Sequence, residues 1–151
     1  MSERSASSYA GDLTPQDAYQ LLKDTPEALL VDVRTRAEWT FVGFADLSAE
    51  NKQSLLVEWQ QFPAMDVNAS FVGEVEAQAA QAVGSDLSKD APLLFLCRSG
   101  VRSMSAAAAM TAAGYTRCFN VLEGFEGDLD EHHHRGQSGG WKARGLPWVQ
   151  R

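Results

Sequence analysis

The sequence has few cysteines, a deficit of positive charge and no long apolar run. Two cysteines in 151 residues cannot support a disulfide-rich scaffold. The 13 Lys and Arg against 20 Asp and Glu give a net charge of −7, which argues against binding to nucleic acid. Apolar runs such as 93–97 are far shorter than the roughly 20 residues that cross a bilayer, so we expect no membrane association.

The N-terminal segment is polar and rich in small residues, and it lacks the apolar stretch of a secretory signal. We therefore expect residues 1–11 to form a flexible arm. The length of the remainder, 12–151, predicts one domain. Without an export signal the expected compartment is the reducing cytoplasm, where an unpaired cysteine stays a thiol.

Helical and strand patterns alternate along the chain. Apolar spacing together with capping signals predicts helices at 15–25, around 35–39, at 71–83 and at 102–113. Continuous apolar runs, typical of strands that are covered on both faces, occur at 28–33, 55–59, 93–96 and 118–121. Such alternation predicts an α/β domain with a parallel sheet.

The strongest candidate for chemistry is the connection between the third of these strands and the last helix. Cys97 ends the strand, and Gly100 allows a tight turn that would aim backbone amides inward. Ligands of open parallel sheets bind beyond the carboxyl ends of the strands, where helix N-termini offer unpaired amides and positive charge. Arg98 and Arg102 add two permanent cations. Together these features favour a thiolate at Cys97, which is a nucleophile suited to anionic substrates.

Three patches of the sequence, in this order, resemble the signatures of the rhodanese-like sulfurtransferases. The segment 30–39 is similar to that family's N-terminal signature, 97–102 to its active-site loop, and 121–125 with 140–147 to its C-terminal signature. The resemblance implies a rhodanese-like three-layer α/β fold, with a parallel sheet of about five strands and helices on both faces. The chain departs from the family pattern over 42–71 and by an insertion over 127–140.

The resemblance also implies a reaction. Cys97 would take the sulfane sulfur of a small anionic donor as a persulfide and pass it to cyanide or a thiol, without a metal or an organic cofactor. An arginine at each end of the loop is similar to the members that prefer thiosulfate. The loop would bind the substrate through the arginine side chains and the backbone amides of Arg98, Ser99, Gly100, Val101 and Arg102.

Three charged residues of the first signature are expected to be structural although they lie near the site. They are Asp32, Arg34 and Glu38, and we expect Arg34 and Glu38 to pair across a turn. Cys118 is expected to be a small buried residue, with a role as a resolving thiol left open.

The histidines at 132–134 fit a solvated turn better than a metal site, because adjacent residues do not share a helix face and no further ligand is near in sequence. A weaker hypothesis places these imidazoles at the rim of the pocket.

Two other functions stay open at this point. The domain could serve as a persulfide carrier or regulatory module that binds a partner protein, which would accept the sulfur. It could also be a cysteine phosphatase or arsenate reductase, although those enzymes have a longer loop than the four residues that separate Cys97 from Arg102.

Overall fold

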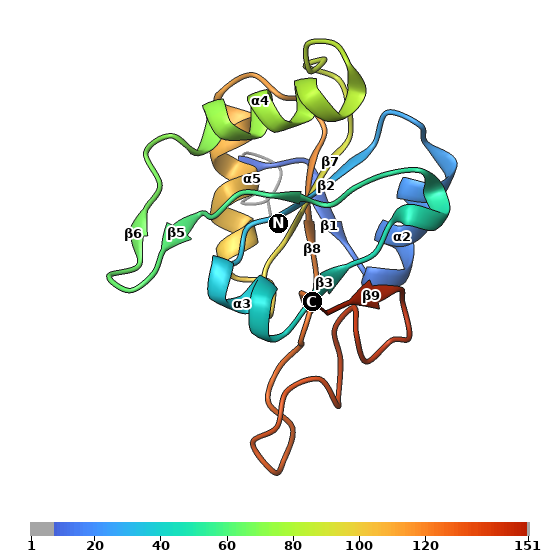
Figure 1. Cartoon of the computed structure of the whole chain (residues 1–151), viewed down its shortest axis with the longest axis vertical. Coiled ribbons are helices and arrows are strands. Elements are labelled where there is room, and N and C mark those ends of the chain that lie inside the picture. The colour runs from blue at the N-terminus through green and yellow to red at the C-terminus, as the bar shows by residue number, and fades with distance from the viewer. Residues whose placement is uncertain (1–7, 151) are drawn as a thin grey trace.

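The buried apolar runs form the middle of a parallel sheet in the computed structural model, which describes residues 8–150 (Figure 1). The sheet has the order β1-β8-β7-β2-β4, and each adjacent pair of strands is parallel. Its strands are β1 (Gly11–Leu13), β2 (Leu29–Asp32), β4 (Leu55–Leu56), β7 (Leu93–Leu96) and β8 (Cys118–Val121). The expected α/β architecture with a five-stranded parallel sheet is therefore confirmed.

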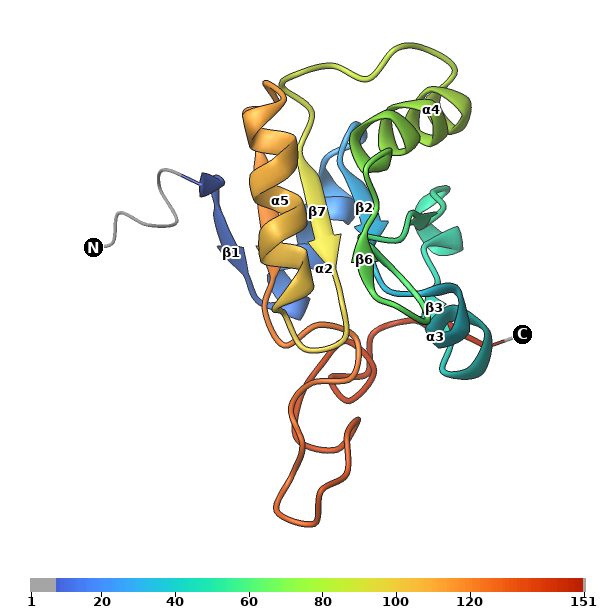
Figure 2. The ribbon, with the colours of Figure 1, turned by 90° about the vertical axis from the view of Figure 1, so that its left-hand side faces the viewer.

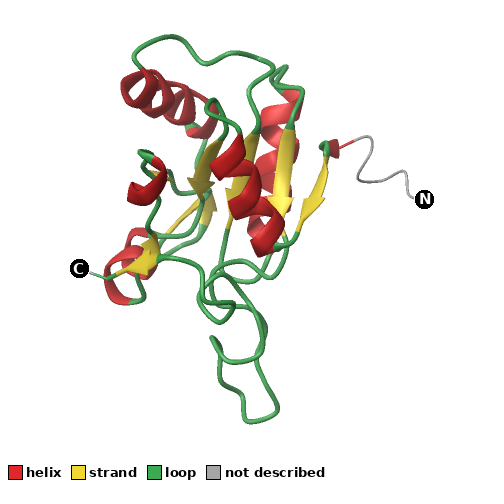
Figure 3. Cartoon of the chain, turned by 90° about the vertical axis from the view of Figure 1, so that its right-hand side faces the viewer, coloured by secondary structure: helices red, strands yellow, loops and turns green. Residues whose placement is uncertain are grey.

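Helices cover both faces of this sheet. Helices α4 (Phe71–Val83) and α5 (Arg102–Ala112) pack on one face, and α2 (Pro15–Asp24) packs on the other (Figures 1 and 3). The short helix α3 (Arg36–Phe41) and the 3-10 turn η1 (Ser48–Glu50) follow β2 and precede β4. Within residues 8–150, no helix is long and apolar enough to span a membrane.

The helix starts follow the capping signals of the sequence. The Thr14 hydroxyl accepts the amide of Asp17 at 3.1 Å, which satisfies one of the free donors in the first turn of α2. Before α3, Thr35 and Glu38 form a reciprocal capping box. This box fixes Glu38 in the first turn of a helix that borders the site described below.

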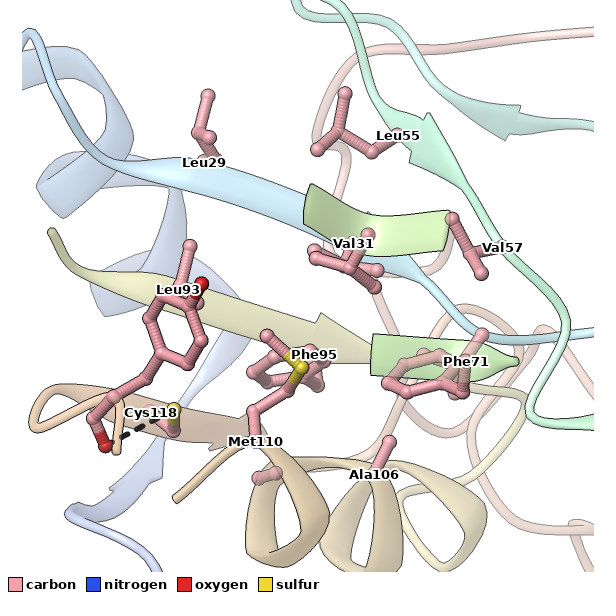
Figure 4. Packing of buried hydrophobic residues seen from close by; sticks show 14 of the residues in the cluster. Leu29, Val31, Leu55, Val57, Phe71, Leu93, Phe95, Ala106, Met110 and Cys118 are labelled. Atoms are coloured by element: carbon pink, nitrogen blue, oxygen red, sulfur yellow. Dashed lines mark hydrogen bonds between the residues drawn. The ribbon is translucent and has the colours of Figure 1, made fainter. Parts of the chain in front are cut away.

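The apolar strand residues alternate between two cores. Leu29, Val31, Leu93 and Phe95 face α4 and α5, where they pack with Met110 and other residues (Figure 4). The intervening residues of the same two strands face α2 and belong to the second core, which contains Leu30, Leu94, Leu96, Phe125 and Trp141. Every residue of β2 and β7 is therefore buried, as continuous apolar runs predict.

The domain begins earlier than the sequence analysis placed it. Tyr9 is 3% exposed and belongs to the core, the amide of Ala10 donates to the Cys118 carbonyl at 2.8 Å, and Gly11 begins β1. The expected flexible arm over 1–11 is thus wrong for residues 8–11; the rest of that range lies outside the described residues. The strand is too short, and too polar at Asp12, to stand out in the sequence.

The connection between β2 and α4 contains more structure than the sequence revealed. The run at 55–59 is a strand only over β4, although the amides of Val57 and Trp59 still bond to the carbonyls of Asp32 and Val33. A small hairpin follows, with β5 (Gln60–Gln61) antiparallel to β6 (Asp66–Val67).

The C-terminal segment and the segment that follows α3 meet in a second small sheet. Strand β3 (Phe44–Ala45) pairs antiparallel with β9 (Trp148–Val149). The insertion at 127–140 forms an arm that projects from the carboxyl ends of the parallel strands and away from the helices (Figure 2). Its base is closed by bonds from the Gly136 amide to the Glu126 carbonyl and from the Arg135 side chain to the Gly127 carbonyl.

Candidate active site

Cys97 lies directly after β7, which is the middle strand of the five. The residues that follow turn back into the N-terminus of α5, so the thiol sits at the carboxyl edge of the sheet as the sequence predicted. A second segment, residues 125–127, supports this turn through backbone hydrogen bonds. The Phe125 amide donates to the Cys97 carbonyl at 2.7 Å, and the amides of Glu126 and Gly127 donate to the Arg98 carbonyl at 2.9 and 3.1 Å.

Glycine is required at two positions for this arrangement. Gly100 has φ +104°, a conformation that other residues rarely adopt. Gly124 has φ +63°, and a Cβ atom there would lie 2.5 Å from the carbonyl oxygen of Cys97. The supporting segment can therefore approach the active-site loop only because residue 124 has no side chain.

The Cys97 sulfur has two polar contacts. The Gly100 amide donates to Sγ at 3.1 Å, and the Ser103 Oγ lies 3.2 Å from the same atom. An amide that points at sulfur stabilises negative charge on it. The inward-facing amide that the loop sequence predicted is thus present at Gly100.

Cys97 lines an open cavity of about 440 Å³. The residue is only 1% exposed, so the loop and its neighbours cover almost all of it. The cavity is lined by Cys97, Arg98, Ser99, Val101 and Arg102, and also by Glu38, Gln60 and Met65. This volume is ample for a small anion and leaves room for the end of a second substrate.

The two arginines of the loop differ in their surroundings. Arg102 forms a bidentate pair with Glu38, with Nη1–Oε1 and Nη2–Oε2 distances of 2.9 Å each. Arg98 is exposed, and its guanidinium has no hydrogen-bond or ion-pair partner among residues 8–150. The loop therefore presents one free cation, at Arg98, rather than the two that the sequence analysis expected.

The pairing of Arg102 with Glu38 shifts the pKa values of both groups. Burial acts to raise the pKa of Glu38, but the hydrogen bonds and charge of Arg102, the Thr35 amide and the charge of Arg34 together outweigh it and hold that pKa below its ordinary value. Burial acts to lower the pKa of Arg102, and the Glu38 carboxylate outweighs it, so that pKa is raised. Both groups are charged at neutral pH and largely cancel each other's field at the cavity.

The expected pairing of Arg34 with Glu38 is wrong. Arg34 is fully buried and binds Asp32 instead, with an Nη2–Oδ2 distance of 2.7 Å. Its Nη2 also donates to the Gly43 carbonyl at 2.6 Å, and the guanidinium lies over the ring of Phe125 at 4.3 Å. Arg34 thus links β2 to the segment that supports the active-site loop, which agrees with a structural role.

Sequence reasoning missed Gln60 and Met65 in the cavity wall. They come from the β5–β6 hairpin, which carries no periodic pattern and no motif, so no signal in a single sequence would have identified them. Ser103 was missed for another reason, since a serine in the first turn of a helix is usually interpreted as exposed. Here it is fully buried against the sulfur.

Cys118 lies at the opposite end of β7 from Cys97. It pairs in register with Leu93, and Cys97 lies four residue steps further along the chain. That separation corresponds to roughly 13 Å, well beyond the Cα–Cα range of a disulfide. Both cysteines are free, and a role of Cys118 as a resolving thiol is incompatible with this register.

The histidines at 132–134 lie on the projecting arm and do not line the cavity, so the hypothesis that placed them at its rim is wrong. The Asp130 carboxylate accepts the amides of His132 and His134 and so closes a turn in the arm. In the part of the chain that the structure describes, no group of three or more His, Cys, Asp or Glu residues is arranged to hold a metal ion.

The domain that carries this site matches a known protein family. The model of the rhodanese-like domain matches residues 14–131, so the chain belongs to the rhodanese-like family. Among solved structures, Rv0390 from M. tuberculosis is similar, with 46% identity and a TM-score of 0.83, over 95% of this chain and 100% of that one.

Two curated relatives extend the comparison. An uncharacterized protein of Rickettsia rickettsii is 39% identical over 87% of this chain and 90% of its own length. A protein of Allochromatium vinosum named sulfurtransferase is 27% identical over 91% of this chain and 94% of its own. The fold also resembles the polysulfide-sulfur transferase homodimer of Wolinella succinogenes, with 20% identity, a TM-score of 0.57, and coverage of 98% of this chain and 84% of that one.

Proposed function

We propose that this protein is a sulfurtransferase that moves a sulfane sulfur from thiosulfate, or a similar anionic donor, to a thiol or cyanide by way of a Cys97 persulfide. One observation carries the proposal. Cys97 lines an open cavity, and its sulfur accepts the Gly100 amide at 3.1 Å. That geometry stabilises a negatively charged sulfur where a small donor can reach it.

In the first step the Cys97 thiolate attacks the outer sulfur of thiosulfate. The bond between the two sulfurs of the donor breaks, and sulfite leaves with the bonding electron pair. The product is a Cys97 persulfide whose terminal sulfur carries the negative charge. Arg98 holds the sulfonate end of the donor, because Arg98 lines the cavity and its guanidinium has no hydrogen-bond or ion-pair partner among residues 8–150.

In the second step an acceptor removes the terminal sulfur. A thiolate or cyanide attacks it, the bond within the persulfide breaks, and the Cys97 thiolate is regenerated. The acceptor is a small molecule or a sulfur-accepting protein, since the open cavity exposes the terminal sulfur to either. We place this chemistry in the cytoplasm, because it needs a reduced thiol.

The other residues of the site act around Cys97. The loop residues Ser99 and Val101 line the wall that faces the donor, and Arg102 with Glu38 shapes that wall as a neutral pair. The Asp32–Arg34 pair fixes the end of β2 beside the loop. The domain, which begins at Tyr9, acts as one rhodanese-like unit.

The test is the intact mass of the protein after treatment with thiosulfate. We expect the wild type and Cys118→Ala each to gain one sulfur that a reductant removes, and Cys97→Ser to gain none. Turnover is then measured with cyanide or a small thiol as acceptor. Loading without turnover would indicate a persulfide carrier instead of an enzyme, and absence of loading on the wild type would contradict the proposal.

A further inference from the structure

A chain of buried hydrogen bonds leads from Cys97 away from the cavity. The Cys97 Sγ contacts the Ser103 Oγ at 3.2 Å, and Ser103 donates its hydroxyl to the Asn120 Oδ1. The Asn120 Nδ2 then donates to the Asp12 Oδ1 at 3.1 Å. Ser103 is fully buried and Asn120 is 1% exposed, so water does not compete for these groups. The reaction proposed above uses none of these three side chains.

The direction of this chain is fixed from its far end. A carboxylate only accepts hydrogen bonds, and Asp12 accepts from both the Tyr9 hydroxyl and the Asn120 amide. The NH2 group of Asn120 therefore faces Asp12, and its carbonyl oxygen faces Ser103. The single hydroxyl proton of Ser103 is committed to that carbonyl, so the Ser103 oxygen can only accept from Cys97.

We infer that Asp12 and Asn120 hold Ser103 as a hydrogen-bond acceptor for the Cys97 thiol, so that Ser103 and Asn120 act as positioning residues that favour the protonated form of Cys97. If Cys97 ionises, Ser103 can donate to the thiolate only by releasing Asn120. That would leave the buried Asn120 carbonyl without a donor, which is costly. The chain thus opposes the Gly100 amide, which favours the thiolate. The inference rests on the proposed function for its catalytic meaning alone.

The charged groups around Cys97 stay the same in the test below. Arg98 from the same loop, Arg102 from α5 and Glu38 from α3 line the cavity together with Cys97. The Asp32–Arg34 pair lies at the end of β2, and Asp12 lies at the end of the hydrogen-bonded chain. Among residues 8–150, the β5–β6 hairpin contributes the uncharged Gln60 and Met65 to the cavity lining, and β8 contributes Asn120 to the hydrogen-bonded chain.

The test is the rate at which iodoacetamide alkylates Cys97 as a function of pH, followed on the Cys97 peptide by mass spectrometry. In Asn120→Ala the hydroxyl of Ser103 becomes free to donate to the thiolate. We expect the midpoint of the profile to fall by roughly one pH unit, with up to about tenfold faster alkylation well below the midpoint. Ser103→Ala should leave the midpoint unchanged or slightly lower, since it removes an acceptor of the thiol and no donor to the thiolate.

The double variant Ser103→Ala/Asn120→Ala makes the test specific. Its midpoint should equal that of Ser103→Ala, because the effect of Asn120→Ala requires the Ser103 hydroxyl. An Asn120→Ala profile like that of the wild type, or an equal shift in both backgrounds, would overturn the inference. So would a higher midpoint in Ser103→Ala, which alone decides the matter if the Asn120 variants do not fold. The assay involves no sulfur transfer, so its outcome is independent of the proposed function.

Discussion

The two cysteines of this protein lie on or beside neighbouring strands of one sheet and are both almost completely buried, yet their surroundings are opposite. Cys97 follows the carboxyl end of β7, borders a cavity and accepts the Gly100 amide. Cys118 pairs with the amino end of the same strand and lies in the core with Met110 and Tyr115. Its sulfur faces the Tyr115 carbonyl, at 3.8 Å, instead of an amide.

This difference shows that position along the sheet, and not exposure, separates the two thiols. Their exposed fractions are 1% and 0%. Burial without a charge partner raises the pKa of the Cys118 thiol, which keeps it neutral. The N-terminus of α5 and the loop that leads to it lie beyond the carboxyl end of β7, and they supply the amide donor and part of the cavity at Cys97.

The largest expected effect comes from replacing each cysteine by a residue without a thiol. Cys97→Ser should lower sulfur transfer by roughly a thousandfold or more, because a hydroxyl cannot form the persulfide. Cys118→Ala should retain transfer and lose about 1 kcal/mol of unfolding free energy, through the small void it leaves in the core. Sulfur transfer is measured by steady-state kinetics with thiosulfate and cyanide, and stability is measured by urea unfolding. Substantial activity in Cys97→Ser, or its loss in folded Cys118→Ala, would reverse the assignment.

The backbone support behind Cys97 can be broken at Gly124. Gly124→Ala forces a Cβ atom against the Cys97 and Arg98 backbone, and we expect a loss of about 2–4 kcal/mol in unfolding free energy together with a large drop in activity. Gly73→Ala is the matched control. Gly73 lies in α4, and apart from its chain neighbours and the nearby backbone of that helix, no described atom lies within 4 Å of the position that its new methyl group would take. This change should be neutral or stabilise by up to roughly 1 kcal/mol. Similar unfolding curves for the two variants would contradict this account.

The charges on the Cys97 side are expected to contribute unequally. Arg98→Ala should raise the KM for thiosulfate about tenfold, because it removes the free cation of the cavity. Glu38→Gln/Arg102→Gln removes the ion pair as a unit and keeps the net charge, so its KM should change by less than about threefold. Steady-state kinetics at constant ionic strength compare them. A larger effect in the double variant would assign anion binding to Arg102.

The smallest expected effect is the pH dependence of the Glu38–Arg102 pair. The pKa of Glu38 is lowered in the folded protein, so its contribution to stability is present above the unfolded pKa of about 4.3 and is lost as the pH falls through the lower folded value. Glu38→Gln should therefore be less stable than the wild type by about 1 kcal/mol at pH 7, and the difference should shrink below about pH 4. Urea unfolding at both pH values measures it. A difference that grows toward acid would show that the pair does not stabilise the fold.

The strands and helices of the central sheet could be predicted because local signals agree with the fold there. The buried runs at β2 and β7, the cap at Thr14 and the capping box at Thr35 each correspond to an observed element. Strand β1 could not be predicted, because three residues with an exposed Asp12 form a strand only through pairing with β8. Tertiary contact decides such short segments.

The candidate site also contains residues that could be predicted from the sequence and residues that could not. Cys97 and its loop could be identified because the chemistry is contiguous in sequence. The partner of Arg102 could not, because Glu38 is 64 positions away and competes with Asp32 for the nearby arginines. A single sequence gives no measure of which carboxylate reaches which guanidinium.

The pairing of β1 with β8 also has a consequence for biosynthesis. Gly11 aligns with Phe119, so the first strand of the sheet must wait for one of the last. Contacts between such distant segments slow folding, and the sheet edge stays unpaired until they form. A nascent chain on the ribosome can assemble β2, β4 and β7 earlier, but Asp12 and Asn120 meet only at the end. The thiol of Cys97 therefore acquires its complete environment in the final stage of synthesis.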